Sequence, residues 1–250
     1  MSDFRFKEFT VKHDGSAMKV GTDGVLLGAW AELPSSGTLL DVGCGCGLIA
    51  LMTAQRLCAS SCAFHIVGVD VDEGSIKDAV GNFAASPWRD SLQAVQADFL
   101  SYAATLPADS VDAVLSNPPY FSEDLLSPHA RRNLSRHAEN LPFGELLRQV
   151  QRLLKPGATL AMVLPPRAYA QIEALLPETA PCLRLQRLTR VYFKEGKICG
   201  RLLAQWRKLS DGQADFQPVP CEESLILQDP QGNYTPAYCS LVRDFYTWLL

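Results

Sequence analysis

A turn with the sequence Asn117-Pro118-Pro119-Tyr120 carries residue types that can bind a flat amino group. Two adjacent prolines lack N–H donors and restrict the residues before them, so the turn is stiff. The side-chain oxygen of Asn117 and the backbone carbonyl of Pro118 are then fixed acceptors for both hydrogens of a planar –NH2. Two acceptors can draw this poorly nucleophilic nitrogen toward a tetrahedral geometry and aim its lone pair at a sulfonium methyl, while Tyr120 stacks on the base. The alternative is a Pro-rich turn at a strand end.

The second informative segment is the glycine loop at 41–47 (DVGCGCG), whose glycines let the backbone turn tightly and approach a ligand closely. A dinucleotide-binding loop would have its third glycine at position 48, where this chain has Leu48. Asp41, two residues before the first glycine, suits a cationic ligand such as the amino group and sulfonium of S-adenosylmethionine. The alternative is a glycine-rich turn without a ligand.

Acidic residues also end the next two predicted strands. A carboxylate at Asp70 can accept both ribose hydroxyls of a nucleoside, and Asp98 can accept from an adenine amino group. The common alternative for each is a helix N-cap or a solvated turn. Asp72 competes with Asp70 for the ribose, and we favour Asp70 because it lies closer to the end of its strand.

Alternating elements must position these residues. Hydrophobic patterning predicts strands over 38–42, 64–70, 92–98, 111–117 and 158–164. It predicts helices over 48–57, 73–86 and 143–157, the last with Gly157 as its stop signal. Strands that alternate with helices indicate a doubly wound α/β fold with a mostly parallel sheet.

The end of the chain differs in pattern. Two β-rich runs within 187–206 surround Glu195-Gly196-Lys197, which predicts an antiparallel hairpin at the edge of the sheet. A short strand over 224–228 and a helix from about Pro236 follow. We expect one domain over 1–250, with an N-terminal arm at 1–35, a core at 36–208 that contains a substrate loop at 121–140, and a C-terminal strand and helix at 209–250.

Together these motifs resemble the class I S-adenosylmethionine-dependent methyltransferases that methylate amino groups. The segment 19–30 (KVGTDGVLLGAW), together with SNPPYF at 116–121, resembles the bacterial tRNA1(Val) adenine-N6-methyltransferase family, which modifies adenine 37 beside the anticodon. The resemblance spans almost the whole chain, including a late segment from Asn233 to Tyr246. It implies a Rossmann-like, seven-stranded sheet with the antiparallel hairpin at its C-terminal side.

The resemblance also implies roles for individual residues. The methionine part of the cofactor is framed by Asp41, Gly43, Gly45 and Gly47, the ribose lies on Asp70 and the adenine on Asp98. The arm covers the carboxylate and amino end of the cofactor with Lys19, Thr22 and Asp23, although the apolar residues of this segment also fit a helix packed across the sheet. The target base is held by Asn117, Pro118, Pro119, Tyr120 and Phe121.

Two basic stretches are candidate RNA contacts. The segment 121–140 follows the Asn-Pro-Pro-Tyr turn and carries Arg131, Arg132 and Arg136, and the segment 184–208 holds eight Lys/Arg against one acid. An adenine in an RNA loop must be unstacked to enter a pocket, and basic side chains beside that pocket can hold its phosphates. The alternative is a solvated run of charges.

Composition excludes several classes. The chain is 47% hydrophobic and 20% charged with a net charge of −4, which excludes a disordered chain and a histone-like nucleic-acid coat. No apolar run approaches the ~18 residues of a membrane span, and the N-terminus lacks the apolar core of a signal peptide. The eight cysteines form no CxxC pair, so we expect reduced thiols in the cytoplasm, no metal, and Cys44 and Cys46 as small space-filling residues.

Three alternatives remain open at this stage. The same turn is used by enzymes that methylate the glutamine amide of release factors, but those carry a helical domain before the first strand. Enzymes that methylate DNA adenine or ribosomal guanine also use it. A cofactor-binding scaffold without activity is the third alternative, and the intact Asp41 and Asn117 argue against it. The sequence favours a monomer without determining the oligomeric state.

Overall fold

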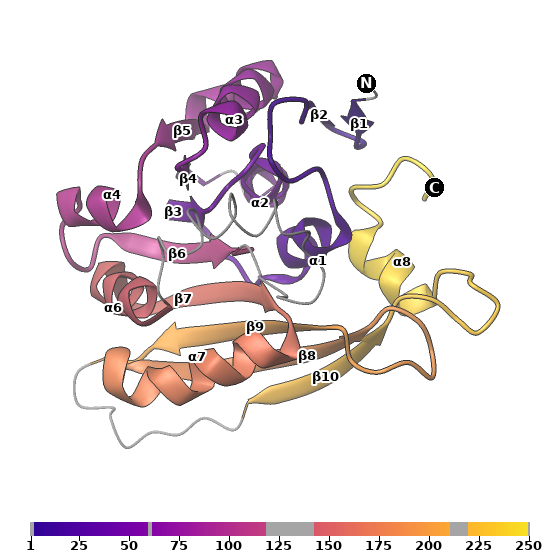
Figure 1. Ribbon diagram of the computed structural model, residues 1–250. Coiled ribbons are helices and arrows are strands. Elements are labelled where there is room, and N and C mark those ends of the chain that lie inside the picture. Colours follow the sequence, from indigo (N-terminus) through magenta and orange to yellow (C-terminus); the bar gives the residue numbers. More distant parts are fainter. Residues whose placement is uncertain (1–2, 60–61, 119–142, 211–219, 250) are drawn as a thin grey trace, which may run out of the picture.

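A single large β-sheet organises the chain in the computed structural model, which describes residues 3–59, 62–118, 143–210 and 220–249 (Figure 1). The strand order is β10-β8-β9-β7-β6-β3-β4-β5, and every neighbouring pair is parallel except those that involve β9. The strands are β3 (Gly37–Val42), β4 (Phe64–Asp70), β5 (Leu92–Gln96), β6 (Val111–Ser116), β7 (Leu154–Leu164), β8 (Leu183–Tyr192), β9 (Arg201–Lys208) and β10 (Cys221–Ile226). The predicted α/β class with a mostly parallel sheet is confirmed.

The edge beyond the predicted hairpin carries an additional strand. The hairpin is confirmed as β8 and β9, but β10 pairs in parallel with β8, with Ser224 opposite Arg190, so the sheet has eight strands among the described residues rather than seven. Its sequence indicated a strand, but no local signal specifies a parallel partner more than 30 residues away. The sheet therefore extends past the antiparallel strand that was expected at its edge.

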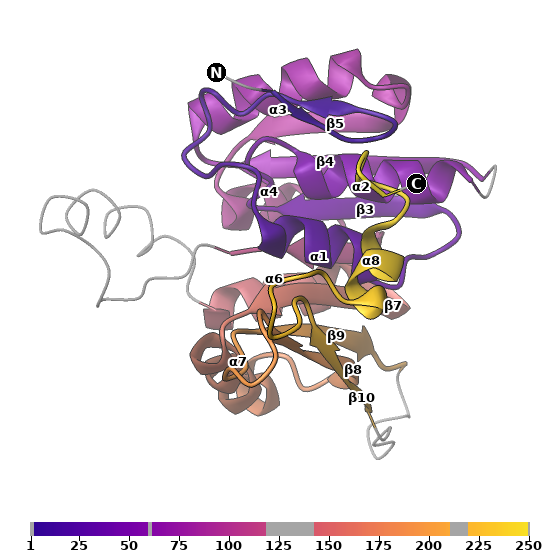
Figure 2. The ribbon, with the colours of Figure 1, turned by 90° about the vertical axis from the view of Figure 1, so that its right-hand side faces the viewer.

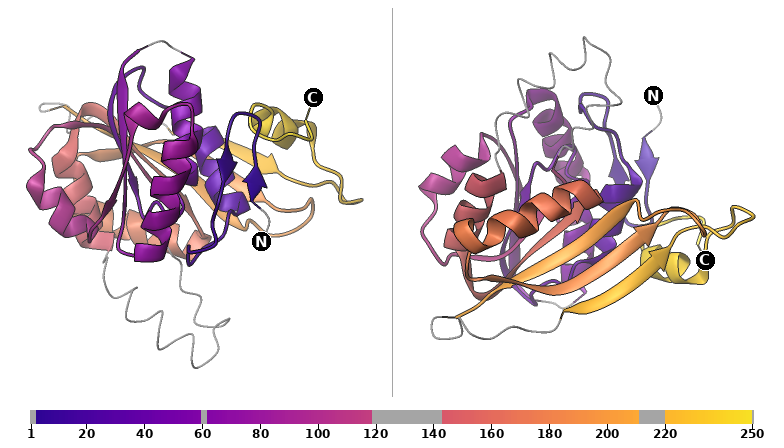
Figure 3. Two further views of the ribbon diagram at one scale, coloured as in Figure 1. Left: turned by 90° about the horizontal axis from the view of Figure 1, so that it is seen from above. Right: turned by 60° about the horizontal axis from the view of Figure 1, so that its bottom comes forward.

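Helices cover both faces of the sheet. One face carries α1 (Thr22–Trp30), α2 (Leu48–Cys58), α3 (Glu73–Ala85) and α8 (Pro236–Val242), and the other carries α4 (Phe99–Thr105), α6 (Phe143–Leu153) and α7 (Pro166–Thr179). Successive strand residues alternate between the two cores: Leu39 packs with the first set and Leu40 with the second. Figure 2 shows α1, α2 and α8 in front of the sheet, and the right panel of Figure 3 shows α7 lying across the strands at the β8–β9 end.

The boundary between α6 and β7 differs from the prediction. The helix ends at Leu153 and β7 begins at Leu154, so Gly157 is not the helix stop but a strand residue with a φ of 83°. The residue before a proline is pushed toward extended backbone, so Lys155, which precedes Pro156, cannot continue the helix easily. Gly157 lies where the pairing of β7 with β6 shifts register, which its positive φ permits.

The arm packs closely on the sheet through α1. A Cβ added at Gly28 would lie 2.8 Å from Sδ of Met52, so this glycine lets α1 approach α2. Trp30 Nε1 donates to Thr189 Oγ1 at 2.9 Å, which joins the end of α1 to β8. The packed helix across the sheet, one of the two roles considered for this segment, is therefore present, and it fixes where the beginning of α1 lies.

The two ends of the chain lie against each other. A small hairpin of β1 (Phe4–Arg5) and β2 (Thr10–Val11) begins the arm, and the backbone N–H of Lys7 donates to Phe245 O at 2.8 Å. Within the described ranges, no helix is both long and apolar enough to cross a bilayer.

Candidate active site

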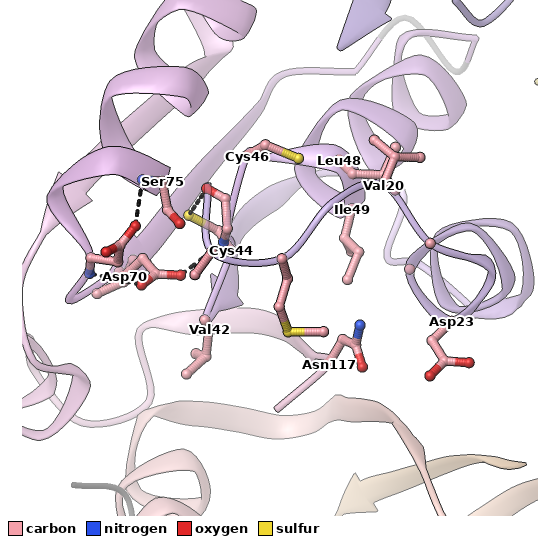
Figure 4. A pocket seen from close by; sticks show the side chains of 18 of the residues that line it. Val20, Asp23, Val42, Cys44, Cys46, Leu48, Ile49, Asp70, Ser75 and Asn117 are labelled. Atoms are coloured by element: carbon pink, nitrogen blue, oxygen red, sulfur yellow. Dashed lines mark hydrogen bonds between the residues drawn. The ribbon is translucent and has the colours of Figure 1, made fainter. Parts of the chain in front are cut away.

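A cavity of about 570 Å³ opens at the carboxyl ends of β3, β4, β5 and β6 (Figure 4). Parallel strands all end at this edge of the sheet, so residues far apart in sequence meet there. Most of the predicted cofactor residues line this cavity, namely Lys19, Thr22, Asp23, Gly43, Gly45, Asp70, Asp98 and Asn117. Asp41 and Gly47 are not among the lining residues.

The glycines of the loop have two different functions. Gly43 and Gly45 have φ values of 71° and 54°, and a Cβ at either would meet no atom within 4 Å. The cavity therefore reaches the bare backbone of the loop, which is the space that a closely bound ligand needs. Gly47, with a φ of 82°, supports the loop from behind, because its Cβ would lie 2.4 Å from the ring of Phe83.

Asp41 lies behind the loop rather than at the cavity wall. It is fully buried, and its Oδ2 accepts from the backbone N–H of Ala50 at 3.1 Å, while Oδ1 has no hydrogen-bond partner among the described residues. Burial, together with the negative charge of Asp70, raises the pKa of Asp41 from 3.8 to about 7. Asp41 therefore does not line the cavity, and it supports the start of α2 below the loop.

The variant Asp41→Asn tests whether the buried carboxyl group of Asp41 has this raised pKa. The raised pKa means that folded protein binds more protons than unfolded chain between pH 4 and 7, so stability falls as the pH rises through that range. Asn keeps an acceptor for Ala50 and cannot ionise. We expect the stability of the variant relative to wild type to increase by about 2–3 kcal/mol between pH 5 and pH 8, measured by urea unfolding. Parallel pH profiles for the two proteins would contradict a buried, titrating Asp41.

Asp70 ties the glycine loop to the end of β4. Its Oδ2 accepts from the backbone N–H of Gly45 at 2.8 Å and its Oδ1 from that of Asp72 at 3.0 Å. Each carboxylate oxygen has a second lone pair, so Asp70 can still accept from hydroxyl groups of a ligand in the cavity. Asp72 instead caps α3, accepting from Ser75 N at 2.7 Å. Both acids line the cavity, so the choice of Asp70 as the ribose acceptor stays a prediction.

Asp98 also has a structural role. It is the N-cap of α4 and accepts from Ser101 N at 2.9 Å, as the helix-cap alternative predicted. It nevertheless lines the cavity beside Phe99 and Val71, and neither of these apolar residues was singled out in the sequence. A hydrogen-bond acceptor in a cavity that also has apolar lining residues suits the edge of a planar base.

The beginning of α1 forms the opposite wall. Gly21 is its N-cap and provides no side-chain hydrogen bond, and Thr22 and Asp23 follow it into the cavity lining. Asp23 Oδ2 accepts from Arg201 Nε at 2.7 Å, so its charge is already paired. Lys19 Nζ donates to the backbone carbonyl of His13 at 2.5 Å. These three residues border the cavity as predicted, but two of them are engaged with protein groups.

Asn117 stands at the end of β6, where the cavity lies between the glycine loop and α1 (Figure 4). Ser116 Oγ donates to Val42 O at 2.8 Å and so fixes the end of β6 against the residue before Gly43. Pro118 follows and is buried. The structure therefore brings Asn117 to the same cavity as the glycine loop. The remaining predicted residues of the turn and its loop lie outside the described residues: Pro119, Tyr120, Phe121, Arg131, Arg132 and Arg136.

Other lining residues were not predicted from sequence. Phe193 reaches the cavity from the β8–β9 hairpin, 73 positions after the turn. Cys44 and Cys46 line it as well, and burial raises the pKa of Cys46 to about 11. Gly68 makes room for Cys44, because a Cβ there would lie 2.9 Å from its Sγ. Neutral, packed thiols agree with a space-filling role. The described ranges contain no group of three His, Cys, Asp or Glu side chains arranged to hold a metal ion.

Comparison with solved structures supports the fold. A predicted O-methyltransferase from Agrobacterium tumefaciens is 18% identical with a TM-score of 0.67, and the match covers 89% of this chain and 96% of that one. A protein named TrmN from Thermus thermophilus is 24% identical with a TM-score of 0.50, covering 74% of this chain and 47% of that one. These similarities concern the arrangement of the sheet and its helices.

Comparison of sequences is more specific. The family described as "Methyltransferase small domain" matches residues 18–171, which include the second half of the arm, the glycine loop and Asn117. The curated protein "tRNA1(Val) (adenine(37)-N6)-methyltransferase" from Bacteroides fragilis is 37% identical over 244 residues, 97% of each chain. The protein of the same name from Photobacterium profundum is 36% identical, again over 97% of each chain. The predicted family is confirmed: this chain belongs to the tRNA1(Val) (adenine(37)-N6)-methyltransferase family.

Proposed function

We propose that this protein transfers the methyl group of S-adenosylmethionine to the exocyclic N6 of adenine 37 in tRNA1(Val). Membership of the family identifies the protein as a methyltransferase that uses S-adenosylmethionine as methyl donor, in agreement with the sequence motifs. The observation that carries the proposal is the position of Asn117, which lines the same cavity as the open backbone at Gly43 and Gly45. A methyl donor and an amino acceptor can therefore meet in one cavity.

The residues present fit the donor. Open space above Gly43 and Gly45, acceptors at Asp70 and Asp98 and the uncapped beginning of α1 match an amino acid joined to a nucleoside. When bound there, S-adenosylmethionine supplies a methyl group on a positively charged sulfur. The chain contributes orientation, since the loop, the strand ends and α1 hold the two ends of such a molecule from opposite sides.

The acceptor is prepared by the turn after β6. Asn117 Oδ1 and the carbonyl of Pro118 accept the two hydrogens of the adenine amino group, and Tyr120 stacks on the ring. Holding both hydrogens favours the tetrahedral nitrogen of the transition state over the planar nitrogen of the free base. The nitrogen becomes acidic once it is methylated, so loss of its proton needs no strong base. The pocket thus acts by geometry and electrostatics.

Substrate binding is proposed to use the basic side chains after the turn. Changing Arg131 and Arg132 together to Ala is expected to weaken tRNA binding and to reduce the salt dependence of log K by about 0.7–0.9 for each phosphate that is no longer neutralised. Filter binding or fluorescence anisotropy at several salt concentrations measures both quantities. Unchanged affinity and unchanged slope would show that this segment does not bind the RNA.

One labelling experiment tests the proposed function. The protein is incubated with methyl-labelled S-adenosylmethionine in three parallel reactions. These contain total tRNA, DNA or protein, respectively, from a strain lacking the gene. We expect label in tRNA, recovered as N6-methyladenosine after digestion. Label in protein would favour the glutamine-amide alternative, label in DNA the DNA alternative, and no label in any fraction the inactive scaffold.

Two further properties belong to the proposal. The protein is proposed to act in the cytoplasm, where tRNA is available, and to act as a monomer. Fractionation of cells that express a tagged copy tests the location, and light scattering of the purified protein tests the oligomeric state.

A further inference from the structure

The part of the arm that lines the cavity is preceded by a stretch that is hydrogen-bonded to α3. Residues 17–21 border the cavity, whereas residues 12–16 lie outside its lining. Ser16 is buried, and its backbone N–H and its Oγ both donate to Asp78 Oδ2, at 2.8 and 2.7 Å. Both hydrogen-bond donors of this serine are therefore directed at one carboxylate of α3.

A second attachment lies one helical turn further along α3. Asn82 is buried, and its Oδ1 accepts from the backbone N–H of Lys12 at 2.8 Å, while its Nδ2 donates to the carbonyl of Lys12 at 2.8 Å. The same Nδ2 donates to the carbonyl of Cys46 in the glycine loop at 2.9 Å. One buried amide thus joins the arm to the loop that forms a wall of the cavity.

Two glycines let the arm approach α3 this closely. Gly74, Asp78 and Asn82 are spaced by four residues and so share one face of the helix. A Cβ at Gly74 would lie 2.3 Å from Gly15 O, and a Cβ at Gly15 would lie 2.9 Å from Gly74 O. Both obstacles are backbone atoms, which cannot rotate away as a side chain can. This face of α3 therefore fits the backbone of the arm only because both positions lack a side chain.

Hydrogen bonds within the arm connect the attached stretch to the cavity. His13 Nδ1 accepts from the backbone N–H of Val20 at 3.0 Å, and Lys19 Nζ donates to the carbonyls of His13 and Asp14, at 2.5 and 3.2 Å. Figure 2 shows the arm (indigo) passing α3 before it turns down to the beginning of α1. A displacement of the attached stretch would therefore also displace the residues that line the cavity.

We propose that Asp78 and Asn82 are positioning residues for the methyl donor, which hold the arm on α3 and thereby keep residues 17–21 at the cavity. This inference rests on the proposed function, because it takes S-adenosylmethionine as the molecule in the cavity. Neither side chain lines the cavity, so both act through the arm. A ligand that requires the docked arm binds more weakly when fewer molecules have the arm docked. Loss of the attachments therefore weakens donor binding and has little effect on the methyl-transfer step.

Asp78→Ala is expected to raise the Kd for S-adenosylhomocysteine by about 10- to 100-fold, or about 1.4–2.8 kcal/mol, as for a lost hydrogen bond to a charged group. Calorimetric titration measures this change. Asp78→Asn keeps an acceptor oxygen for Ser16 and is expected to stay within about fivefold of wild type. In the donor-free protein, hydrogen exchange at the backbone N–H groups of residues 12–20 should be faster in Asp78→Ala than in Asp78→Asn. At saturating donor and tRNA, kcat should fall by no more than about threefold in Asp78→Ala.

Gly74→Ala tests the same contact without removing any hydrogen-bonding group. Alanine is a better helix former than glycine, so the variant keeps α3, but its methyl group would meet the carbonyl of Gly15. It is expected to weaken binding of S-adenosylhomocysteine to an extent similar to Asp78→Ala. Gly81→Ala is the matched control, because a Cβ at this position of the same helix meets no atom within 4 Å. It is expected to retain the wild-type Kd and kcat.

The inference is overturned if Asp78→Ala or Gly74→Ala binds S-adenosylhomocysteine as tightly as wild type does. It is also overturned if Asp78→Asn weakens binding as much as Asp78→Ala, or if kcat at saturating donor falls as steeply as the Kd rises. Where Asp78→Ala does not fold, Gly74→Ala alone decides. Wild-type protein that binds S-adenosylhomocysteine yet leaves tRNA unlabelled contradicts the proposed function instead, so the two failures are distinguishable.

Discussion

Asn117→Ala is expected to reduce kcat for tRNA methylation by about 10²–10³-fold, the usual effect of removing one preorganised hydrogen-bonding group from a transition-state site. Asn117 lines the cavity between the glycine loop and α1, and the bond from Ser116 Oγ to Val42 O fixes the end of its strand. Without the amide oxygen, one hydrogen of the acceptor amino group loses its partner at the moment when the nitrogen must become tetrahedral. Single-turnover kinetics at saturating donor and tRNA measures this step.

The matched control is Asn233→Ala, which makes the same change in the turn after β10, away from the cavity lining. It should retain wild-type kcat. We expect Asn117→Ala to change the Kd for S-adenosylmethionine by only a few-fold, because most donor contacts are proposed to come from Asp70, Asp98 and the loop. A variant that methylates tRNA at the wild-type rate would contradict the role given to Asn117, and one that fails to bind donor would place Asn117 in the donor site alone.

Asp70→Ala is the second change with a large expected effect, and it acts on binding rather than on chemistry. A hydrogen bond to a charged group contributes about 1.5–3 kcal/mol, so losing the acceptor for ribose hydroxyls should raise the donor Kd by about 10- to 150-fold. The loop is loosened as well, because Gly45 N–H loses its partner at 2.8 Å. Calorimetric titration with S-adenosylhomocysteine, which lacks the reactive methyl, measures the effect without turnover.

Asp72→Ala decides between the two neighbouring acids. Asp72 caps α3 through Ser75 N, so its loss should lower the free energy of unfolding by about 1 kcal/mol. Donor affinity should remain within a few-fold of wild type. The assignment of the ribose to Asp70 would be wrong if Asp72→Ala weakened donor binding more than Asp70→Ala did.

Much of the site could be predicted because its signals are local. The glycine loop must follow a strand and open a helix for its backbone to face a ligand, and both neighbouring elements have clear patterns. Strand ends of a parallel sheet share one edge, so the sequence alone was enough to group Asp70, Asp98 and Asn117 at one site. Asp41 shows the limit of this reasoning, since a residue two positions before the first glycine points below the loop rather than into the cavity.

What the sequence did not reveal depends on tertiary contacts. Phe193 reaches the cavity because β9 pairs with β7 and so brings the β8–β9 hairpin beside α1, where Arg201 also pairs with Asp23, 178 residues away in the sequence. The helix α7 escaped notice because it begins with Pro166 and contains Pro177 in its last turn. A segment with prolines at both of these positions fits a loop as well as a helix, and only its packing on the sheet shows that it is a helix.

The most direct test of the central claim uses two synthetic tRNA1(Val) transcripts that differ only at position 37. With adenine there, we expect one methyl group per transcript, recovered as N6-methyladenosine and mapped to position 37 by mass spectrometry. With a purine that lacks the exocyclic amino group, we expect no methyl transfer, although the altered base can still enter the cavity. Equal methylation of both transcripts would contradict the claim that this cavity holds an amino nitrogen in line with the methyl donor.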